Sequence, residues 1–170
     1  FRPVGSVRTS PHMCKLIELT KGHSAIVDDD DFDELSRFSW YAMGSGSAIY
    51  AARYAPIEEG GPVIYMHRQI VGGNPVCVDH ANRNTLDNRR VNLRAADISR
   101  NAANVGLSAS NRSGFKGVVW DASRELWRAD IRVNRRRFFL GYYGTPEEAA
   151  RAYDARALKE FGEFAFQNFH

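Results

Sequence analysis

The sequence has only two cysteines and no long apolar run, and these absences exclude several classes of protein. Cys14 and Cys77 are too few and too far apart for a disulfide framework or a CxxC zinc site, so we expect reduced thiols without a disulfide partner. No apolar run approaches the roughly 20 residues that cross a bilayer. The N-terminus also lacks the apolar block of a secretory signal, so we expect an intracellular protein with no membrane partner.

The first twelve residues, FRPVGSVRTSPH, precede a methionine that is followed by the segment CKLIELTKG. Met13 therefore looks like a natural start. We expect residues 1–12 to be a leader or tag and assign them no fold.

The net charge is only +3, but it is unevenly distributed along the chain. Residues 1–60 hold six Lys or Arg against nine Asp or Glu, whereas residues 61–111 hold six against three. Between Arg112 and Arg137 lie eight basic residues and three acidic ones. A basic strip of this kind predicts a polyanionic partner, with nucleic acid as the first candidate. The strip alone would also fit a solvated charged face.

The N-terminal part is predicted to be rich in β structure. Two short strands surround a KG turn, and the acidic run Asp28 to Asp31 precedes a short helix at Phe32 to Phe38. Further β structure is expected from Ser39 to Arg53, interrupted by the flexible Met43 to Ser47. We expect the acidic run to cap the helix rather than to bind calcium, because the ligand spacing of an EF-hand is missing.

The segment VDHANRNTLDNRRVNLR, residues 78–94, joins a histidine to a carboxylate, several amides and several arginines. Hydrolysis of a phosphodiester needs a base, a cation that absorbs charge, and groups that hold the polyanion. His80 can be the base, because a neutral imidazole is well populated near pH 7. Asp79 points the other way along an extended strand, and Asn101 on the following helix can supply an amide oxygen for a hard cation such as Mg²⁺.

The C-terminal part predicts three strands followed by one helix. The runs FKGVVW, LWRADIRV and RRRFFLGYY, within residues 115–143, are prone to β structure and are separated by turn-like segments. In the helix that follows, Thr145 can be the N-cap, Pro146 lies in the first turn, and Glu148 completes a capping box. Gly162 is expected to end this helix.

Alternation along the strands predicts which face of this sheet is open. One side of the second strand carries Trp127, Ala129, Ile131 and Val133, and the other carries Arg128, Asp130 and Arg132. In the third strand Phe138, Leu140 and Tyr142 alternate with Arg137 and Phe139. We therefore expect one face to pack on the helix and the other to present arginines to DNA, with an ordinary solvated face as the alternative.

Residues 66–105 resemble an HNH nuclease of the homing-endonuclease type, in the pattern DHxNxNxxDNRRxNLR followed by a helical Asn. The two asparagines that follow His80 at twelve and twenty-one residues make a chance match improbable. The resemblance implies the ββα-metal fold (His-Me finger), in which a β-hairpin and a helix hold one ion, Mg²⁺ or Mn²⁺. It implies that His80 is the general base, that Asp79 and Asn101 are metal ligands, and that Asn92 braces the loop.

Residues 112–169 resemble the ethylene-response-factor (APETALA-type) DNA-binding domain of plant transcription factors, which also occurs fused to phage and bacterial HNH nucleases. The matching segments are SGFKGVVW, WRADIRV, RRRFFLGYYGTPEEAARAYD and FGEFAFQNF. The resemblance implies a sheet that lies in the major groove and DNA contacts from Lys116, Arg132, Arg137 and Phe139. Val119 replaces a base-reading Arg and Phe139 a Trp, so the plant target sequence does not carry over.

Strand geometry and charge add Trp120, Arg124, Arg128 and Arg135 to the expected DNA contacts. In the nuclease part we expect backbone contacts from Arg68, Arg89, Arg90 and Arg94.

The predicted fold class is α+β. The predicted parts are the leader at 1–12, an N-terminal β-rich region at 13–61, an HNH motif at 62–105, a linker at 106–111 and a DNA-binding domain at 112–170.

We therefore expect a site-selective, metal-dependent homing endonuclease that acts on double-stranded DNA. A monomer would nick, and a double-strand break would require a homodimer or two visits. The expected location is the bacterial cytoplasm, including that of a phage-infected cell. The alternative is a DNA-binding regulator with an inactive nuclease half, which the presence of Asp79, His80 and Asn101 disfavours. A zinc-type structural module is disfavoured by the cysteine count.

Overall fold

The computed structural model describes residues 13–46, 48–56, 58, 61, 63–73 and 75–169. The expected leader lies outside these residues. Within the described part of the chain, no helix is long and apolar enough to span a membrane. Contacts divide the chain into two units, one of residues up to 74 with 84–94 and the other of 75–83 with 95–170.

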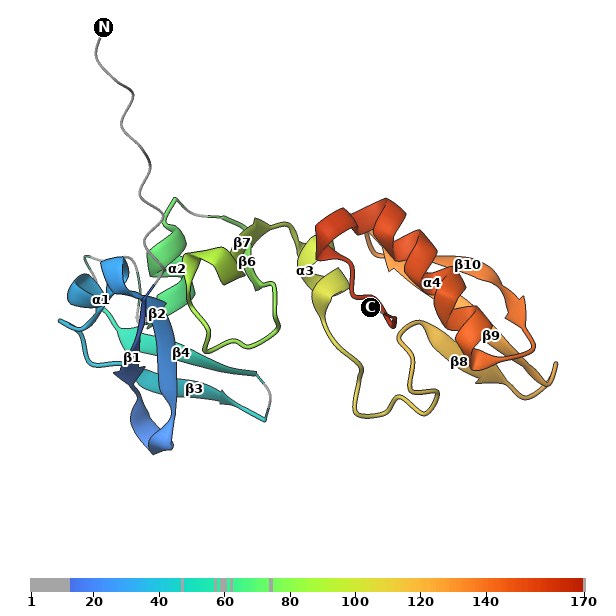
Figure 1. Cartoon of the computed structure of the whole chain (residues 1–170), viewed down its shortest axis with the longest axis horizontal. Helices are drawn as coiled ribbons and strands as arrows, with labels where there is room; N and C mark the ends of the chain where they lie inside the picture. Colours follow the sequence, from blue (N-terminus) through green and yellow to red (C-terminus); the bar gives the residue numbers. More distant parts are fainter. Residues whose placement is uncertain are drawn as a thin grey trace, which may run out of the picture. The chain divides into compact units, whose positions relative to one another are not determined.

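The described residues have a mixed α+β architecture with small antiparallel sheets and a C-terminal helix (Figure 1). In the first unit β1 (Cys14–Glu18) pairs with β2 (Ser24–Asp28), and β3 (Tyr41–Ser45), β4 (Ala48–Tyr54) and β5 (Val63–Tyr65) form a three-stranded sheet. The helices of this unit are α1 (Asp29–Leu35), α2 (Met66–Val71), and the short 3₁₀ turns η1 (Thr20–Gly22) and η3 (Arg90–Asn92).

Helix α1 differs from the expectation at both ends. It begins at Asp29, three residues before the predicted start, so the acidic run forms its first turn, where carboxylates favour the positive end of the helix dipole. It also ends at Leu35 rather than at Phe38. Helix α2 begins at Met66, because Val63–Tyr65 pairs with β4 as strand β5.

The arginine-rich loop at residues 84–94 is joined to strand β2 of the first unit by backbone hydrogen bonds. Leu86 accepts a backbone hydrogen bond from Ile26 at 2.8 Å, and Asn88 donates one back to Ile26, also at 2.8 Å. The buried core beneath these strands includes Val27, Leu35 and Met66. The arginine-rich loop is therefore held along β2 rather than extended into solvent.

The second unit contains the elements that carry Asp79, His80, Asn101 and the expected DNA contacts of the C-terminal part, and β7 runs into it from the first unit. They are β6 (Cys77–His80), which pairs with β7 (Leu93–Ala96), then α3 (Ile98–Asn104), β8 (Val118–Asp121), β9 (Leu126–Val133), β10 (Arg136–Tyr143), α4 (Pro146–Phe161) and the 3₁₀ turn η4 (Gly162–Phe164). The last three strands form an antiparallel sheet in the order β10-β9-β8, along which α4 lies (Figure 1).

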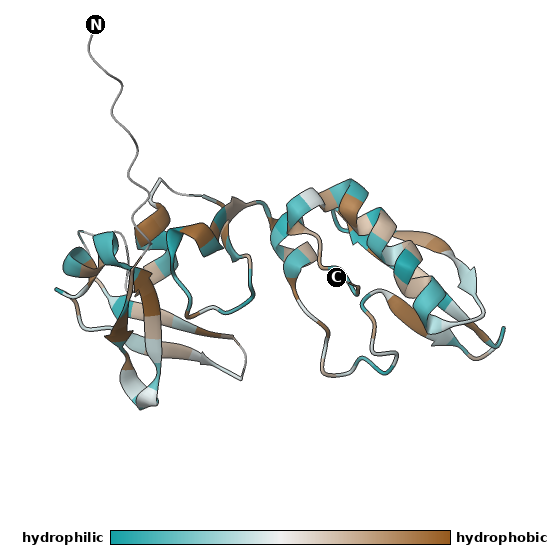
Figure 2. Cartoon of the chain, in the orientation of Figure 1, coloured by the Kyte–Doolittle hydropathy of each residue, from teal (hydrophilic) through white to brown (hydrophobic). Residues whose placement is uncertain are grey.

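The predicted order of three strands and a helix is confirmed, and so are the signals that bound the helix. The Thr145 hydroxyl accepts from the Glu148 backbone N–H, and the Glu148 carboxylate accepts from that of Thr145, which completes the capping box. Gly162 is the C-cap. Along α4 hydrophobic and hydrophilic residues alternate (Figure 2), and one stripe at helical spacing is buried: Ala150, Tyr153, Ala157 and Phe161.

The predicted alternation holds in β9 but fails in β10. Ala129 and Ile131 are buried, as expected for the helix side of β9. In β10 the register shifts between Phe139 and Gly141, so Leu140 is an extra residue that packs into the core. Such a bulge reverses the facing of every later residue. Tyr142 therefore lies opposite Arg128 on the open face, and its predicted place against the helix is wrong.

Candidate functional site

Asp79 and His80 are adjacent in β6, and both side chains are buried, with 4% and 5% of their surface exposed. The side-chain amide of Asn104 donates to Asp79 Oδ1 at 2.9 Å and to the His80 backbone oxygen at 2.8 Å. One residue at the end of α3 thus fixes both the proposed ligand and the backbone of the proposed base. The predicted site residues did not include Asn104.

The expected ligand Asn101 lies three residues before Asn104 on α3. Helix α3 therefore carries both the expected ligand Asn101 and the residue that contacts β6. Sequence spacing could have identified Asn104, because the segment NAAN repeats an asparagine at this interval.

The two expected ligands, Asp79 and Asn101, would offer one carboxylate and one amide oxygen to a metal. Among the described residues there is no group of three or more His, Cys, Asp or Glu that could hold an ion. A hard cation with few protein ligands and several retained waters is what one carboxylate and one amide accommodate. The donor chemistry therefore fits Mg²⁺ or Mn²⁺.

Asn92 is buried and donates from its side-chain amide to the Asp87 backbone oxygen at 2.7 Å. Asp87 is itself buried and accepts a bidentate contact from Arg89 at 2.7 and 2.6 Å. The Asn92 amide thus joins η3 to Asp87, and both residues lie in the first unit.

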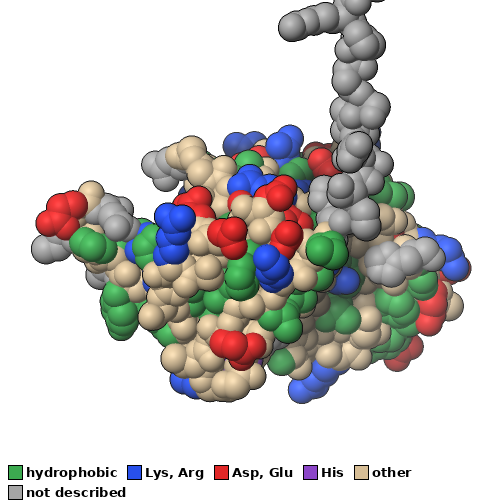
Figure 3. Space-filling view, turned by 60° about the vertical axis from the view of Figure 1, so that its left-hand side comes forward, with side chains coloured by type: hydrophobic (Ala, Val, Ile, Leu, Met, Phe, Trp, Pro, Cys, Tyr) green, Lys and Arg blue, Asp and Glu red, His purple; other side chains and the backbone are tan. Residues whose placement is uncertain are grey.

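The two arginines of the RR pair are engaged with carboxylates. The Asp87 carboxylate raises the pKa of the Arg89 guanidinium. Arg90 contacts Asp31 at 2.8 and 2.6 Å, and its backbone N–H donates to Asp28 at 2.7 Å. Because both guanidinium groups are paired with carboxylates, Arg89 and Arg90 offer DNA less positive charge than the sequence suggests. Consistently, Figure 3 shows acidic and basic side chains next to one another rather than a single basic patch.

Of the other two arginines expected on the DNA backbone in this part, Arg68 is exposed on α2 and Arg94 is half-buried in β7.

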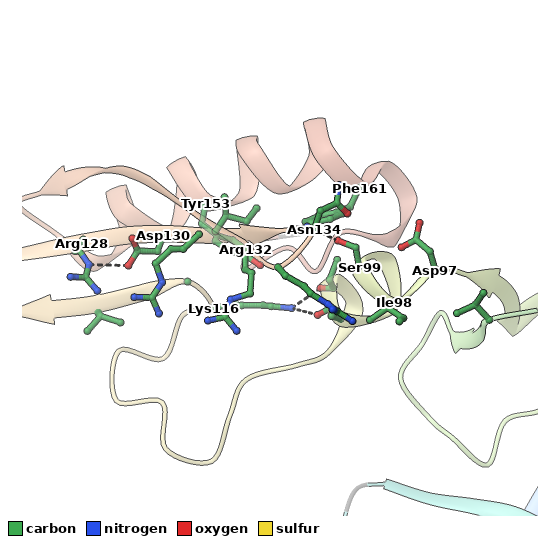
Figure 4. Close-up of a pocket in the computed structure, with 18 residues that line it drawn as sticks. Asp97, Ile98, Ser99, Lys116, Arg128, Asp130, Arg132, Asn134, Tyr153 and Phe161 are labelled. Carbon is green, nitrogen blue, oxygen red and sulfur yellow. Dashed lines mark hydrogen bonds and ion pairs between the residues drawn. The ribbon is translucent and has the colours of Figure 1, made fainter.

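The open face of the C-terminal sheet carries the predicted arginines. Arg137 pairs with Arg132, Phe139 with Asp130, and Tyr142 with Arg128 across β9 and β10. We call this surface the arginine face, defined by Arg128, Arg132, Arg137, Phe139 and Tyr142. Figure 4 shows Arg128 and Arg132 on the side of the strands away from Tyr153 and α4.

A groove of about 830 Å³ is lined by residues of the arginine face, by residues of α3, and by Ile131, Tyr153 and Phe161 from the α4 side of the sheet. Its lining includes Arg128, Arg132, Arg137 and the exposed Arg135 of the β9–β10 turn, together with Ile98 and Ser99 of α3. Within it, Arg128 donates to Asp130 at 2.8 Å, so one acid tempers the positive charge. A concave, arginine-lined surface suits a phosphate backbone.

Three residues expected to contact DNA occupy other positions. Trp120 pairs with Trp127, so it lies on the opposite side of the sheet from the arginine face. Arg124 is exposed but forms an ion pair with Asp121 at 3.4 Å and lies 5.0 Å from the Tyr142 ring centroid. Lys116 turns its ammonium toward α3, where it donates to three backbone carbonyls.

Comparison with known proteins gives two kinds of match. Residues 113–162 match the AP2 domain family. A protein of Acanthamoeba polyphaga mimivirus, described as an uncharacterised HNH endonuclease, is 30% identical over 152 residues, which span 87% of this chain and 76% of that protein.

Two further relatives match over shorter segments. Protein 3.8 of Escherichia phage T7 is 39% identical over 54 residues, which are 32% of this chain and 45% of the phage protein. An ethylene-responsive transcription factor of Arabidopsis thaliana is 42% identical over 69 residues, which are 38% of this chain and 35% of the plant protein.

Proposed function

Because the chain belongs to the HNH endonuclease family and carries a C-terminal AP2 domain, we propose that it is a site-selective DNA endonuclease dependent on one divalent metal ion. The observation that carries this proposal is the position of Asp79 and His80 in one strand whose end is fixed by α3, the helix that bears Asn101.

His80 would accept the proton of the attacking water, the role of an imidazole general base. The oxygens of Asp79 and Asn101 would hold Mg²⁺ or Mn²⁺. When bound, such an ion supplies positive charge next to the phosphate that is attacked. Asn104 keeps Asp79 in place, so that its carboxylate is ordered before the substrate arrives.

The arginine face would select the target. Arginine forks read guanine edges in the major groove, and Phe139, which is 56% exposed, can contact a base or sugar. Arg135 lines the same groove and would hold phosphate.

The finer features of this function are also proposals. One His80 and Asp79 pair serves one phosphodiester, so a monomer would nick and a homodimer would be needed for a coordinated double-strand break. The homing type of action, the bacterial location and the ββα-metal motif within residues 62–105 are supported by the sequence pattern. The domain boundaries at 105 and 112 rest on the same pattern.

The test is the substitution His80→Ala, with His23→Ala as a histidine control in the turn after β1. We expect the first variant to lose cleavage in Mg²⁺ while it binds DNA with nearly the affinity of the wild type, and we expect the control to cut normally. The substrate is a randomised duplex library from which bound and cut molecules are sequenced. Cleavage at the wild-type rate by His80→Ala, in protein free of contaminating nuclease, would rule out the assigned base.

The regulator hypothesis gives a different result in the same experiment. A wild-type protein that selects one sequence from the library but cuts none of it, in Mg²⁺ or Mn²⁺, would identify a DNA-binding regulator with an inactive nuclease half.

A further inference from the structure

The helix that carries Asn101 and the AP2 sheet share one hydrophobic core. Ala103 of α3 packs in the same buried cluster as Ile131 of β9 and Tyr153 of α4, and Ala96 of β7 belongs to that cluster as well. Cys77 of β6 packs at its edge. The strand with Asp79 and His80 and the helix with Asn101 are therefore built onto the AP2 domain.

Lys116 holds the C-terminal end of α3. Its ammonium donates to the backbone oxygens of Ala103 and Val105, both at 2.5 Å, and of Ala102 at 3.4 Å. The last carbonyls of a helix have no partner within it, and the negative end of the helix dipole attracts a cation. Figure 4 shows dashed lines that run from the Lys116 ammonium to α3. Burial lowers the pKa of Lys116 to about 8, as expected for a lysine enclosed by protein.

Lys116 is itself fixed to the AP2 domain by its backbone. Its N–H donates to Asn168 Oδ1 at 2.7 Å, and its carbonyl accepts from Asn168 Nδ2 at 3.2 Å. Asn168 is in turn held by the buried Asp154 of α4. The contact between Lys116 and α3 is therefore anchored on the long helix of the AP2 domain.

Two further contacts hold the same region. At the N-terminal end of α3 the Ser99 hydroxyl accepts from the Asn134 N–H at 3.1 Å. After His80, Arg83 lies 4.8 Å from the centroid of the Phe166 ring, on which the Lys116 ammonium also lies, at 5.2 Å. The helix is thus attached at both ends.

The two faces of α3 have different neighbours. Ile98, Ser99 and Ala102 line the groove of the arginine face, whereas Asn104 contacts β6. A helix with its side chains is only about 10–12 Å across. DNA in the groove would therefore lie close to the metal ligands, at a distance set by one helix.

We propose that Lys116 is a positioning residue that locks α3 to the AP2 sheet, so that the DNA strand is cut at a fixed offset from the sequence that the sheet reads. This inference rests on the proposed function. In this proposal Lys116 contacts α3 rather than DNA. The length of the connection at residues 106–111 therefore does not determine which phosphodiester is cut.

The test compares Lys116→Met, Lys116→Arg and an insertion of Gly-Ser-Gly-Ser after Ser108, a residue in the exposed stretch between α3 and β8. The control is Lys159→Met, the same change at an exposed lysine of α4. Each full-length protein is given a duplex selected from the library by the wild type. Cut positions are mapped at nucleotide resolution, and affinity and the footprint are measured without metal.

We expect the wild type, the control and the insertion to cut at one and the same position. Lys116→Met is expected to keep the footprint and to bind within about twofold of the wild type, because RT ln 2 is only about 0.4 kcal/mol, yet to cut at several phosphodiesters with a rate about tenfold lower. Lys116→Arg, which keeps the cation, should restore the single position. The insertion combined with Lys116→Met should spread the cuts further.

Two results would overturn the proposal: a single wild-type cut position at the wild-type rate in Lys116→Met, or a shifted cut in the insertion variant alone. A loss of the footprint in Lys116→Met would instead make Lys116 a DNA contact.

If the wild type does not cut, the proposed function fails, and the attachment of α3 by Lys116 is tested by hydrogen exchange. Faster exchange of the α3 amides in Lys116→Met supports the attachment, and unchanged exchange refutes it. If Lys116→Met does not fold, Ser99→Ala, which removes the contact at the other end, takes its place.

Discussion

The side chain of Asn104 contacts both members of the proposed catalytic pair. Its one amide group donates both to the Asp79 carboxylate and to the His80 backbone, and the side chain is buried. A buried acceptor that loses its donor costs about 1–3 kcal/mol, and here the acceptor is the proposed metal ligand.

We therefore predict that Asn104→Ala lowers the cleavage rate by about tenfold or more and raises the Mg²⁺ concentration needed for half-maximal rate. DNA affinity without metal should stay close to that of the wild type, because Asn104 is not on the arginine face. Single-turnover rates over a Mg²⁺ series give both quantities. An unchanged metal requirement would show that Asp79 does not depend on Asn104.

At the residue scale the sequence indicated a candidate site, but it did not indicate the contacts that the residues make. The DH pair and the spaced asparagines could be recognised because they are a local pattern. The partners of Arg90 and Lys116 could not, because Asp31 lies 59 positions away from Arg90 and Ala103 lies 13 positions away from Lys116. Such pairings depend on how the chain folds back, which charge patterning alone does not reveal.

At the scale of elements, the predictions succeeded where the signal was local. The boundaries of α4 follow from a capping box and a glycine, which act within one turn of the helix. The bulge at Leu140 was not predicted, because it is defined by pairing with β9 and leaves the composition of β10 unremarkable.

The packing of the sheet on α4 depends on Gly117, and we predict that Gly117→Ala is strongly destabilising. The residue has φ of 77°, and an added Cβ would meet the Tyr153 ring within 2.0 Å and the Asp130 carbonyl within 2.7 Å. Gly114→Ala is a matched control with the same φ of 77° and no atom within 4 Å of the added Cβ.

The control should lose only about 1–2 kcal/mol, the cost of left-handed backbone for an L-residue. Gly117→Ala adds an overlap with backbone and a ring, and we expect a total loss of at least about 3 kcal/mol in the free energy of unfolding. Denaturant titration of the two full-length proteins measures the difference. Equal losses would mean that Tyr153 moves aside freely.

At the scale of the whole molecule, the shared core changes how the two functions can be separated. Removing residues 112–170 would uncover Ala103 and take away the contacts of Lys116, so a truncated chain would lose the order of α3 together with DNA recognition. A truncation therefore cannot show which part selects the site. Point substitutions on the arginine face can, because they leave the core intact.

We predict that Arg132→Ala weakens DNA binding and reduces its salt dependence. Arg132 is exposed, lines the groove and lies across from Arg137, so it is placed to neutralise a phosphate or to read a base. If it contacts phosphate, the slope of log affinity against log salt should fall by about 0.9 with little change in sequence preference. If it reads a base, the binding free energy should fall by about 1–3 kcal/mol at one position of the site while the slope stays the same.

The two roles are distinguished by measuring binding of the selected duplex and of its single-base variants between about 50 and 200 mM salt. Lys159→Ala is the control for the loss of one positive charge. Binding by Arg132→Ala that matches the control in affinity, slope and preference would remove this residue from the DNA interface.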